Sequence, residues 1–553
     1  MIAIDEQSTI GETFLRAAKA YARNAFLAVP ANSARAYHPG GFELSYGDAA
    51  RIVKELATVY ARAGYGVGHR VALLLENRPE HLLHKLAMNS LGVCCVPMNP
   101  DHRPREMAYV IDHARVDAVL VIESLAPLLA AALAASRVQP AVVRLDDFEK
   151  ALLPPQVAAV SAVPLAQTPA SVLYTSGTTG RPKGCVLSHR YELAVGEWYA
   201  TRGGLCAFGE GCERLYNPLP LFHVNASVFS FFCLLLKGNC QVQTDRFQAT
   251  RFWHEVRESR ATALHYLGVI VPMLLSQPAS ARDRQHAVRF GIGAGVEPPL
   301  HSVFEERFGF PLVEIWGMTE MVRALANNEQ PRSVGTRAFG KARPGVEVRI
   351  VDGLDVDVPQ GCEGEMVIRH SAAAPRKDFF SGYLDDEAAT EQAWRGGWFH
   401  TGDLVTRAPD GMLRFVDRCK NIIRRSGENI AAAEVEAWLQ THPAVLQAAV
   451  LPVPDEIRGE EVLACVVLRP DAGPGRDAIA RQLFDFCHAG LAYYKSPGWL
   501  WITDHIPTTA TQKIQKHQLF PAGTDPRTVA GMVDLRPLKK RHAVPGRTHV
   551  GSL

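Results

Sequence analysis

The sequence predicts an α/β protein with a large N-terminal domain of parallel βαβ sheets, a small β-rich subdomain and an α+β C-terminal unit. Apolar strand-like runs alternate with helix-like stretches from residue 46 to residue 335. From residue 345 the pattern changes to short alternating strands separated by Gly and Asp turns, and a compact αβ pattern follows. At 553 residues the chain is too long for one core, so at least two domains are expected.

The N-terminal part predicts the parallel sheets. Residues 46–64 are helix-like, 70–75 form a short apolar strand, 80–91 a helix and 92–98 a second strand. Strands that alternate with helices are typical of βαβ units, in which the strands run parallel. Residues 170–173 form another apolar strand, and a polar turn, a short strand-like step at 186–187 and a helix from Ser188 follow it.

The C-terminal part predicts a different architecture. Strands are expected at 346–351, 364–368 and 412–415, then a helix at 432–439, strands at 445–453 and 461–468, and a helix at 475–489. The residues after Leu519 are rich in Pro, Gly, Arg and Lys, and we expect a loosely docked tail there. The chain is therefore divided into residues 1–417, 418–520 and 521–553.

Composition and charge narrow the function. The chain is 47% hydrophobic and 21% charged, as in ordinary globular enzymes. A net charge of +2 argues against nucleic acid or a membrane surface as a partner. The apolar runs are far shorter than the roughly 20 residues that cross a bilayer. The N-terminus lacks the basic start of a signal peptide, and the eleven cysteines lack zinc-like spacing, so a reduced, cytoplasmic protein is expected. A homodimer is left open.

One loop carries the clearest chemical signal. Residues 174–184 read Tyr-Thr-Ser-Gly-Thr-Thr-Gly-Arg-Pro-Lys-Gly, with three glycines, four Ser/Thr hydroxyls and a lysine. Glycines let backbone N–H groups approach an anion, hydroxyls donate hydrogen bonds and the lysine adds charge, so the composition indicates a polyphosphate-binding loop. A plain polar turn is the alternative. A Walker A loop is excluded, because only two residues separate Gly177 from Gly180 and Lys183 is followed by Gly184.

This loop resembles the phosphate-binding loop of the adenylate-forming enzymes, which include acyl-CoA synthetases, adenylation domains of peptide synthetases, and luciferases. Other signature segments of that superfamily appear in its order: Pro-Leu-Pro-Leu-Phe-His at 218–223, Trp-Gly-Met-Thr-Glu at 316–320, Gly-Glu-Met at 364–366, Trp-Phe-His-Thr-Gly-Asp-Leu at 398–404, Val-Asp-Arg-Cys-Lys at 416–420, Arg-Ser-Gly-Glu-Asn at 425–429, and Ile-Pro at 506–507 leading to Lys513. The resemblance covers nearly the whole chain. It implies a hinge at Lys420, a mobile C-terminal lid, and ATP, Mg²⁺ and coenzyme A as ligands.

The resemblance assigns the nucleotide to residues spread along the chain. The loop residues that would hold the β- and γ-phosphates are Thr175, Ser176, Gly177, Thr178, Thr179, Gly180 and Lys183. Thr319 would bind the α-phosphate and Glu320 would ligate Mg²⁺. Asp403 and Arg418 would grip the ribose hydroxyls. Gly293 and Ala294, in a Gly-rich segment, would lie beside adenine, and Trp316 and Gly317 complete the expected cofactor-binding residues.

Catalysis requires two anions, a carboxylate and the α-phosphate, to approach each other. By resemblance, Lys513 would place an ammonium beside both, together with Thr319 and Glu320. His223 would line the acyl site and move between the half-reactions; a buried core histidine is the alternative. Gly427 would border the passage of the pantetheine arm, where a missing side chain leaves room.

The acid pocket is expected to be lined by His223, Val224, Ser227, Tyr266, Gly293 and Arg323. Arg323 lies where relatives commonly keep a neutral residue, so it would favour a second anionic or hydroxylated group on the acid and repel a trimethylammonium group. The alternative is an arginine turned outward to pair with a surface acid. A partial likeness to crotonobetaine/carnitine–CoA ligases, at 271–286, does not fix the substrate.

The sequence therefore predicts an ATP-dependent, AMP-forming acid–CoA ligase for a small or medium acid with a second polar or anionic group. No segment with a phosphopantetheine serine is evident after Lys513, which favours CoA as the acceptor. An acyl-AMP ligase with another acceptor and a betaine-type acid–CoA ligase remain alternatives. A catalytically inactive nucleotide-binding regulator is the alternative from another class of protein, although the joint presence of Glu320, Asp403 and Lys513 argues against it.

Overall fold

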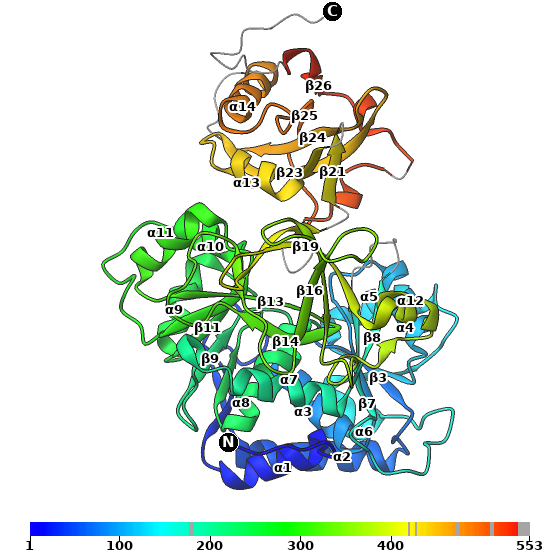
Figure 1. Cartoon of the computed structure of the whole chain (residues 1–553). Coiled ribbons are helices and arrows are strands. Elements are labelled where there is room, and N and C mark those ends of the chain that lie inside the picture. The colour runs from blue at the N-terminus through cyan, green and yellow to red at the C-terminus, as the bar shows by residue number, and fades with distance from the viewer. Residues whose placement is uncertain are drawn as a thin grey trace, which may run out of the picture. The chain divides into compact units, whose positions relative to one another are not determined.

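The computed structural model describes residues 1–175, 182–418, 421–425, 428–470, 475–508, 514–521 and 523–539. The chain divides into two compact units (Figure 1). The larger unit comprises Met1–Arg349, Val367–Thr401 and Arg407–Arg414, and the smaller unit Ile350–Met366, Gly402–Thr406 and Phe415–Leu553. The predicted boundary after residue 417 and the mobility of the lid remain predictions.

The larger unit contains an eight-stranded sheet. Its strands, in spatial order, are β14 (Met321–Ala326), β13 (Leu312–Met318), β12 (Phe290–Ala294), β11 (Ala263–Leu267), β9 (Arg214–Asn217), β10 (Cys240–Gln243), β1 (Ala25–Val29) and β2 (Phe42–Ser45). The six inner strands run parallel, and β14 and β2 at the two edges are antiparallel. This arrangement is expected where helical crossovers join successive strands.

A seven-stranded sheet in the same unit also combines parallel strands with antiparallel strands at one edge. Its order is β18 (Gly382–Tyr383), β8 (Lys183–Ser188), β7 (Pro169–Thr175), β4 (Cys94–Pro97), β3 (Arg70–Leu74), β5 (Ala118–Val121) and β6 (Ala141–Arg144). The strands from β7 to β6 are parallel, whereas β8 and β18 are antiparallel additions at one edge. The predicted strands in this region are confirmed.

Helices pack against these sheets. They are α1 (Ile10–Ala20), α2 (Tyr46–Arg62), α3 (Pro79–Ser90), α4 (Pro104–Ala114), α5 (Ala126–Leu133), α6 (Phe148–Ala151), α7 (His189–Ala200), α8 (Ser230–Lys237), α9 (Ala249–Glu258), α10 (Ile270–Leu275), α11 (Pro298–Phe308) and α12 (Glu387–Ala393). Helix α7 begins where the sequence predicts, because the Ser188 hydroxyl accepts a hydrogen bond from the Tyr191 N–H. Ser45 caps α2 in the same way through the Asp48 N–H.

A five-stranded sheet confirms the β-rich subdomain. Its order is β15 (Ala338–Gly340), β20 (Leu413–Arg418), β19 (Phe399–Arg407), β17 (Gly364–Arg369) and β16 (Glu347–Val351). Strand β19 alternates buried and partly exposed residues along its first seven positions. That period of two is the pattern of a strand with one face on a core.

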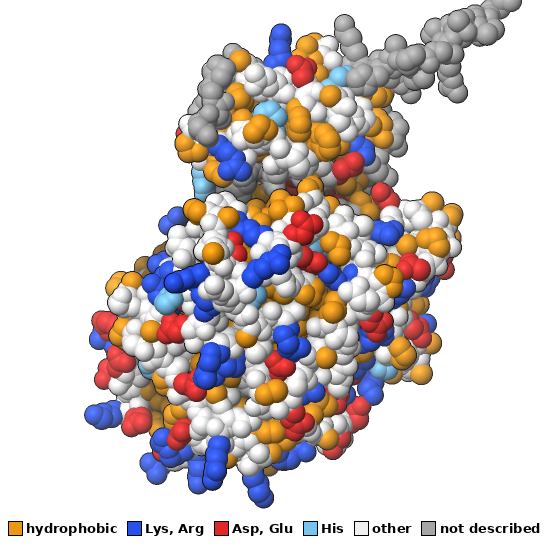
Figure 2. All heavy atoms as spheres, turned by 90° about the vertical axis from the view of Figure 1, so that its left-hand side faces the viewer, with side chains coloured by type: hydrophobic (Ala, Val, Ile, Leu, Met, Phe, Trp, Pro, Cys, Tyr) orange, Lys and Arg blue, Asp and Glu red, His pale blue; other side chains and the backbone are white. Residues whose placement is uncertain are grey.

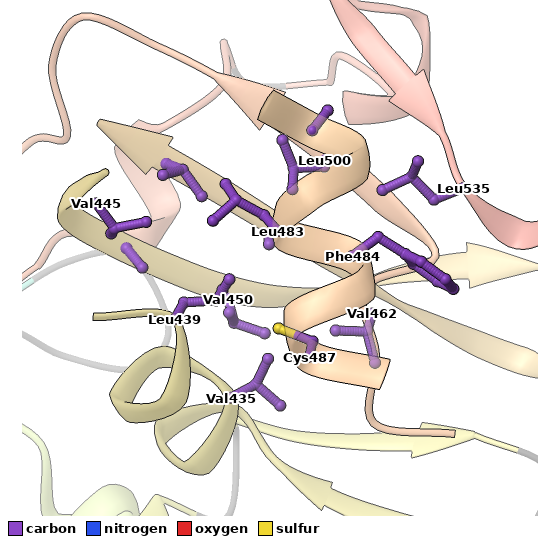
Figure 3. Packing of buried hydrophobic residues seen from close by; sticks show 14 of the residues in the cluster. Val435, Leu439, Val445, Val450, Val462, Leu483, Phe484, Cys487, Leu500 and Leu535 are labelled. Atoms are coloured by element: carbon purple, nitrogen blue, oxygen red, sulfur yellow. The ribbon is translucent and has the colours of Figure 1, made fainter. Parts of the chain in front are cut away.

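The smaller unit has its own core. Its strands are β21 (Ile422–Arg425), β22 (Glu428–Ala431), β23 (Val445–Asp455), β24 (Gly459–Leu468), β25 (Trp499–Ile502) and β26 (Met532–Asp534), and its helices are α13 (Ala432–Gln440) and α14 (Arg476–Gly490). Figure 3 shows Leu483, Phe484 and Cys487 of α14 packed over the strands, beside Val435 of α13. The α/β class and the order of its parts are confirmed.

The end of the chain differs from the expectation of a loosely docked tail. Residues 523–539 contribute β26, which pairs antiparallel with β25, and Leu535, which is 3% exposed, joins the hydrophobic core. The Pro- and Gly-rich composition concealed the alternation of Met532, Val533 and Asp534. A three-residue edge strand is too short to give a clear periodic signal.

The surface agrees with the small net charge. On the face shown in Figure 2, basic and acidic side chains are interspersed over the larger unit, without a large patch of one sign. In the part of the chain that the structure describes, every helix is too short or too polar to pass through a bilayer.

Candidate active site

A tight turn presents the two residues expected at the α-phosphate. Strands β13 and β14 are antiparallel, with Met318 opposite Met321, so Thr319 and Glu320 form the two-residue connection between them. The turn is held from two sides. The Tyr191 hydroxyl of α7 donates to the Thr319 carbonyl at 2.7 Å, and the Phe380 N–H donates to the Glu320 carbonyl at 3.0 Å. Both residues are buried, so their positions are fixed by the fold.

The Glu320 carboxylate belongs to a small charged group. The Tyr383 hydroxyl, on β18, donates to Glu320 Oε1 at 2.8 Å, and Lys183 Nζ lies 4.5 Å from the centre of the Tyr383 ring. Burial and the neighbouring Glu320 charge raise the pKa of Tyr383, so its hydroxyl remains a donor. Tyr383 thus contacts both the Glu320 carboxylate, through its hydroxyl, and the Lys183 ammonium, through its ring.

Lys183 also lies at one end of the predicted phosphate loop. Thr175 ends β7 and Lys183 begins β8, and the two residues are paired across this hairpin. The residues between them therefore connect two antiparallel strands. The pairing holds Thr175 and Lys183 at the two ends of the segment that is expected to bind the phosphates.

The Gly-rich strand β12 leaves space for the Tyr266 side chain on the neighbouring strand. Tyr266 on β11 is paired with Gly293, where an added β-carbon would lie 2.2 Å from the Tyr266 carbonyl oxygen and 2.7 Å from its ring. Such contacts are far inside van der Waals distance, so only glycine fits at 293. The Tyr266 hydroxyl donates to Glu314 Oε1 at 2.8 Å, and the Glu314 carboxylate also accepts the N–H groups of Gly295 and Val296. Glu314 was missed in the sequence, and burial raises its pKa.

The residues around His223 begin a helix. Val224 precedes a π-helical turn at Asn225–Phe229, and the Ser227 hydroxyl donates to the His223 carbonyl at 3.0 Å. The Asn225 N–H donates to His223 Nδ1 at 3.4 Å. Val224 and Ser227 are buried, and the Ser227 hydroxyl is engaged inside the helix. Of these three residues expected in the acid pocket, His223 is the one that is partly exposed.

Buried amides fix the loop that leads to His223. The Leu221 N–H donates to Asn77 Oδ1 at 2.8 Å, and the Leu219 N–H donates to Asn217 Oδ1 at 3.0 Å. Gln243 Nε2 donates to the Leu219 carbonyl at 3.0 Å. These three amides had not been predicted. An asparagine directly before the proline-rich segment is a turn signal that points to Asn217, but Asn77 and Gln243 are distant in sequence.

The expected ribose ligands are neighbours in the smaller unit. Arg418 Nε lies 2.6 Å from Asp403 Oδ1, and the Asp403 side chain is 2% exposed. The preceding Gly402 N–H donates to Glu365 Oε1 at 3.0 Å. Two residues 15 positions apart in sequence are thus brought together, as the resemblance implies.

Arg323 does not carry the free charge that was expected of it. Its guanidinium forms an ion pair with Asp378, and it donates to the Gly345 carbonyl at 3.0 Å. Arg190 Nε donates to the same Asp378 carboxylate at 3.0 Å, and the Asp378 side chain is 1% exposed. The partner is therefore a buried acid and not a surface one. Because Asp378 offsets part of the charge of Arg323, the physical reason for a second anionic group on the substrate is weaker.

The comparisons with known proteins agree with this geometry. The profile of the AMP-binding enzyme family matches residues 22–384, and that of the AMP-binding enzyme C-terminal domain matches residues 434–513. The chain belongs to the AMP-binding enzyme family. A family match over well more than half of the chain also accounts for the order of the signature segments.

Members of this family with similar sequences are acid–CoA ligases. The chain is 29% identical to the crotonobetaine/carnitine–CoA ligase of Citrobacter koseri over 496 residues, which is 86% of this chain and 93% of the relative. It is 31% identical to the sulfoacetate–CoA ligase of Cupriavidus necator over 499 residues, 87% of this chain and 92% of the relative. The protein is an AMP-forming acyl-CoA synthetase, and ATP and CoA are substrates of its family.

Solved structures share the fold. The anthranilate CoA ligase AuaEII, in complex with anthranoyl-AMP, superposes with a TM-score of 0.79 at 22% identity, covering 93% of this chain and 97% of that one. The benzoate CoA ligase of Burkholderia xenovorans superposes with a TM-score of 0.78 at 23% identity, covering 93% of this chain and 99% of that one. At these identities the likeness concerns the fold alone.

Several predicted site residues lie outside the described residues. They are Ser176, Gly177, Thr178, Thr179, Gly180, Lys420, Gly427 and Lys513. The roles of these residues stay predictions. Among the described ones, Ala294 ends β12, and Trp316 and Gly317 lie on β13 just before the Thr319–Glu320 turn.

The Asp378 pairing predicts a large effect on stability. Asp378→Asn should lower the free energy of unfolding by about 3–5 kcal/mol, because it leaves the buried guanidinium groups of Arg190 and Arg323 without their counter-charge. Urea unfolding followed by fluorescence measures the change. Arg376→Ala is the control, since it removes the exposed ion pair with Glu391 and should have a far smaller effect. Equal stability losses in the two variants would contradict a structural role for Asp378.

Proposed function

We propose that this acyl-CoA synthetase acts on a small or medium-sized carboxylic acid that carries a second polar group, in two steps. The acid carboxylate attacks the α-phosphorus of ATP, the bond to the β-phosphate breaks, and pyrophosphate leaves. The CoA thiolate then attacks the acyl carbon of the acyl-adenylate, the bond from that carbon to the AMP oxygen breaks, and AMP leaves. Each step exchanges one bond for another and needs no redox partner.

The first step is supported above all by the contact of Glu320, Tyr383 and Lys183. A lysine beside the phosphate loop offsets negative charge on the β- and γ-phosphates of ATP. Thr319 occupies the adjacent position of the same buried turn as Glu320. The donors are positioned by β8, β13 and β18 before any ligand binds, which is the property that electrostatic catalysis requires.

Glu320 fits the Mg²⁺ that the family uses. Its carboxylate is a hard oxygen donor, buried in the turn, and Tyr383 fixes one of its oxygens at 2.8 Å. Proteins usually bind Mg²⁺ through one or two carboxylates together with substrate phosphates. When bound, the ion would neutralise phosphate charge; Glu320 would hold the ion, and Lys183 would bind the phosphates.

The acid class is inferred from the relatives and from Arg323. Crotonobetaine, carnitine and sulfoacetate, named for the relatives, are small acids with a polar or charged group away from the carboxylate. Asp378 offsets part of the charge of Arg323, although it also pairs with Arg190, so the second group need not be anionic. We therefore retain the second polar group and no longer require a second negative charge.

A betaine-type acid is the second candidate. Arg323 would repel a trimethylammonium group if its charge were uncompensated. Asp378 offsets part of that charge, although it also pairs with Arg190, so the repulsion is weakened. The likeness to crotonobetaine/carnitine–CoA ligases then favours such a substrate against a smaller electrostatic cost.

Matched pairs of acids test the proposal. Acetate is compared with sulfoacetate, and crotonate with crotonobetaine, and AMP, pyrophosphate and acyl-CoA are measured in each reaction. We expect equal amounts of the three products, and a kcat/KM at least tenfold higher for the polar member of at least one pair. A preference for the plain acid in both pairs would overturn the acid class. Formation of ADP would overturn the two-step chemistry.

The proposal also includes CoA as the acyl acceptor and the cytoplasm as the location of the enzyme. CoA is favoured over another acceptor because the named relatives use it. The ten described cysteines are free thiols, which suits the reducing cytoplasm. A homodimer remains a prediction.

A further inference from the structure

Residues 523–539 form a C-terminal extension that packs on the smaller unit. We propose that the C-terminal extension, residues 523–539, is a positioning element for the CoA-dependent step: through Lys539 and Glu461 it fixes the strand that ends at Arg425. This inference depends on the proposed two-step function, because Arg425 directly precedes the segment expected to border the pantetheine arm. Lys539 lies beyond the matched family region, which ends at residue 513.

The extension is built into the smaller unit. Val533 on β26 is paired with Leu500 on β25, and the Leu535 N–H donates to the Gly498 carbonyl at 2.8 Å. Leu535 is 3% exposed within the core. Lys539 therefore follows a segment that is anchored by sheet pairing and by hydrophobic packing.

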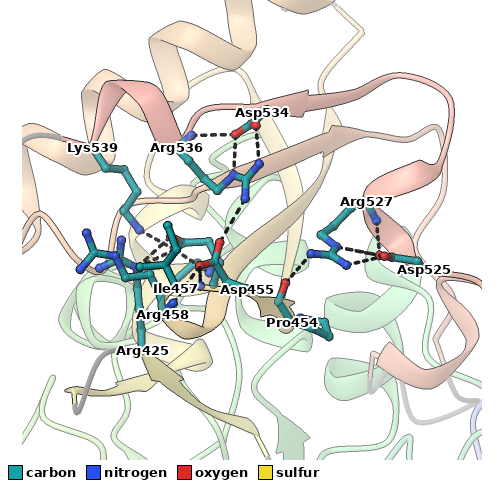
Figure 4. Close-up of polar contacts among 12 residues, drawn as sticks. Arg425, Pro454, Asp455, Ile457, Arg458, Asp525, Arg527, Asp534, Arg536 and Lys539 are labelled. Carbon is teal, nitrogen blue, oxygen red and sulfur yellow. Dashed lines mark hydrogen bonds and ion pairs between the residues drawn. The ribbon is translucent and has the colours of Figure 1, made fainter.

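Lys539 contacts Glu461 in a buried cluster of charges, and Figure 4 labels Lys539 and Arg425 of this cluster. Lys539 Nζ donates to Glu461 Oε1 at 2.6 Å and to the Tyr494 carbonyl at 3.1 Å. Arg425 Nε lies 2.9 and 2.8 Å from the two Glu461 oxygens. The Lys539, Glu461 and Arg425 side chains are 2%, 1% and 6% exposed. One carboxylate thus links the extension to the end of β21.

The fold makes room for this carboxylate. A β-carbon at Gly498 would lie 2.4 Å from Glu461 Cγ, so the absent side chain at 498 leaves space for Glu461. Burial lowers the pKa of Lys539, Glu461 opposes the shift, and the charges of Arg425 and Arg458 add to the lowering, which gives a pKa of about 8. Lys539 is therefore mostly charged at neutral pH, when it shares Glu461 with Arg425.

Arg425 transmits the effect to the β21–β22 hairpin. It is paired with Glu428 on β22 and with Gly459 on β24, so it joins the end of the hairpin to the central strand of the sheet. Glu461 lies two residues along β24 from Gly459, on the same face. If Lys539 is lost, the Glu461 carboxylate gains freedom to shift, and Arg425 and the hairpin end shift with it.

The extension also offers a matched control. Arg527 Nη1 donates to the Pro454 carbonyl at 2.8 Å, and Arg527 pairs with Asp525. Arg527 thus attaches the extension to the end of β23 through partners other than Glu461 (Figure 4). Lys539→Met removes the link to Glu461, and Arg527→Met removes an attachment of the same extension elsewhere.

Half-reaction kinetics on the full-length enzyme test the inference. In Lys539→Met we expect ATP–pyrophosphate exchange within twofold of the parent, and a kcat/KM for CoA at least tenfold lower. Arg527→Met should leave both within about threefold. Hydrogen exchange of residues 422–425 and 428–431 should accelerate in Lys539→Met and not in Arg527→Met. Because Lys539 acts through Glu461, Lys539→Met should add nothing in a Glu461→Gln background.

The alternatives give different results. Equal losses in both half-reactions, or equal effects of the two single variants, would mean that the extension only stabilises the unit, and would overturn the inference. Faster hairpin exchange with an unchanged CoA step would overturn it too, while leaving the two-step function intact. Failure of the proposed function itself would be visible in the parent enzyme, as the absence of AMP and acyl-CoA.

Discussion

Replacing Lys513 with alanine is expected to slow acyl-adenylate formation by about 100- to 1000-fold, the usual effect of removing one preorganised charge donor. Lys513 would place its ammonium beside the acid carboxylate and the α-phosphate, two anions that repel each other until a cation lies between them. Single-turnover formation of acyl-AMP measures the effect directly. The assignment of Lys513 rests on its place after Ile506 and Pro507 in the family pattern.

The second half-reaction provides the control for this result. With acyl-AMP and CoA supplied, Lys513→Ala should form acyl-CoA at nearly the parent rate, because the α-phosphate is already bonded to the acid. Lys54→Ala, at an exposed position of α2, should alter neither step. If both half-reactions fall equally in Lys513→Ala, the assignment of Lys513 to adenylation is wrong.

The second large effect is expected at Glu320. Glu320→Gln keeps an oxygen that can accept the Tyr383 hydroxyl hydrogen bond but removes the negative charge, so the turn should stay folded. Adenylation should fall by about 100- to 1000-fold, because the charge that would hold the metal and balance Lys183 is lost. The Mg²⁺ concentration for half-maximal activity should rise. ATP–pyrophosphate exchange across a Mg²⁺ titration measures both quantities.

Tyr383→Phe distinguishes the effect of the Glu320 charge from the effect of the hydrogen bond that orients the Glu320 side chain. It leaves the Glu320 carboxylate and removes one hydrogen bond, which is worth about 0.5–1.5 kcal/mol. Activity should therefore fall by roughly tenfold or less. A loss in Tyr383→Phe as large as that in Glu320→Gln would show that orientation of the side chain, and not its charge, governs the step.

Local pattern was sufficient for most of the fold. The helix at 46–64 and the strand at 70–75 were predicted within two residues of α2 and β3, because their periodicities are uninterrupted. The prediction of a loosely docked tail was wrong because β26 is too short to show a period. It lies among Pro and Gly residues, and its stability comes from pairing with β25. Such a strand is specified by a tertiary partner that its own sequence does not reveal.

In the candidate site, residues in local motifs could be predicted from the sequence, whereas residues with distant partners could not. Thr319 and Glu320 could be proposed from the sequence because motif residues lie together in the chain, and in the structure they form a two-residue turn; their roles remain predictions. The ion pair of Arg323 could not be assigned from the sequence, because its partner, Asp378, is 55 positions away. Asn77, Gln243 and Glu314 were missed since each acts on a distant backbone or side-chain group. Pairing across long loops is a property of topology, and a single sequence gives little access to it.

The close packing of Gly293 against Tyr266 has a consequence for protein engineering. The two positions share one volume, because the tyrosine ring and carbonyl occupy the space that any larger residue at 293 would need. Libraries that vary position 293 would sample mostly overpacked variants, because the carbonyl oxygen of residue 266 stays in place whatever side chain that residue carries. A search for altered acid selectivity should therefore keep glycine at 293 and vary position 266.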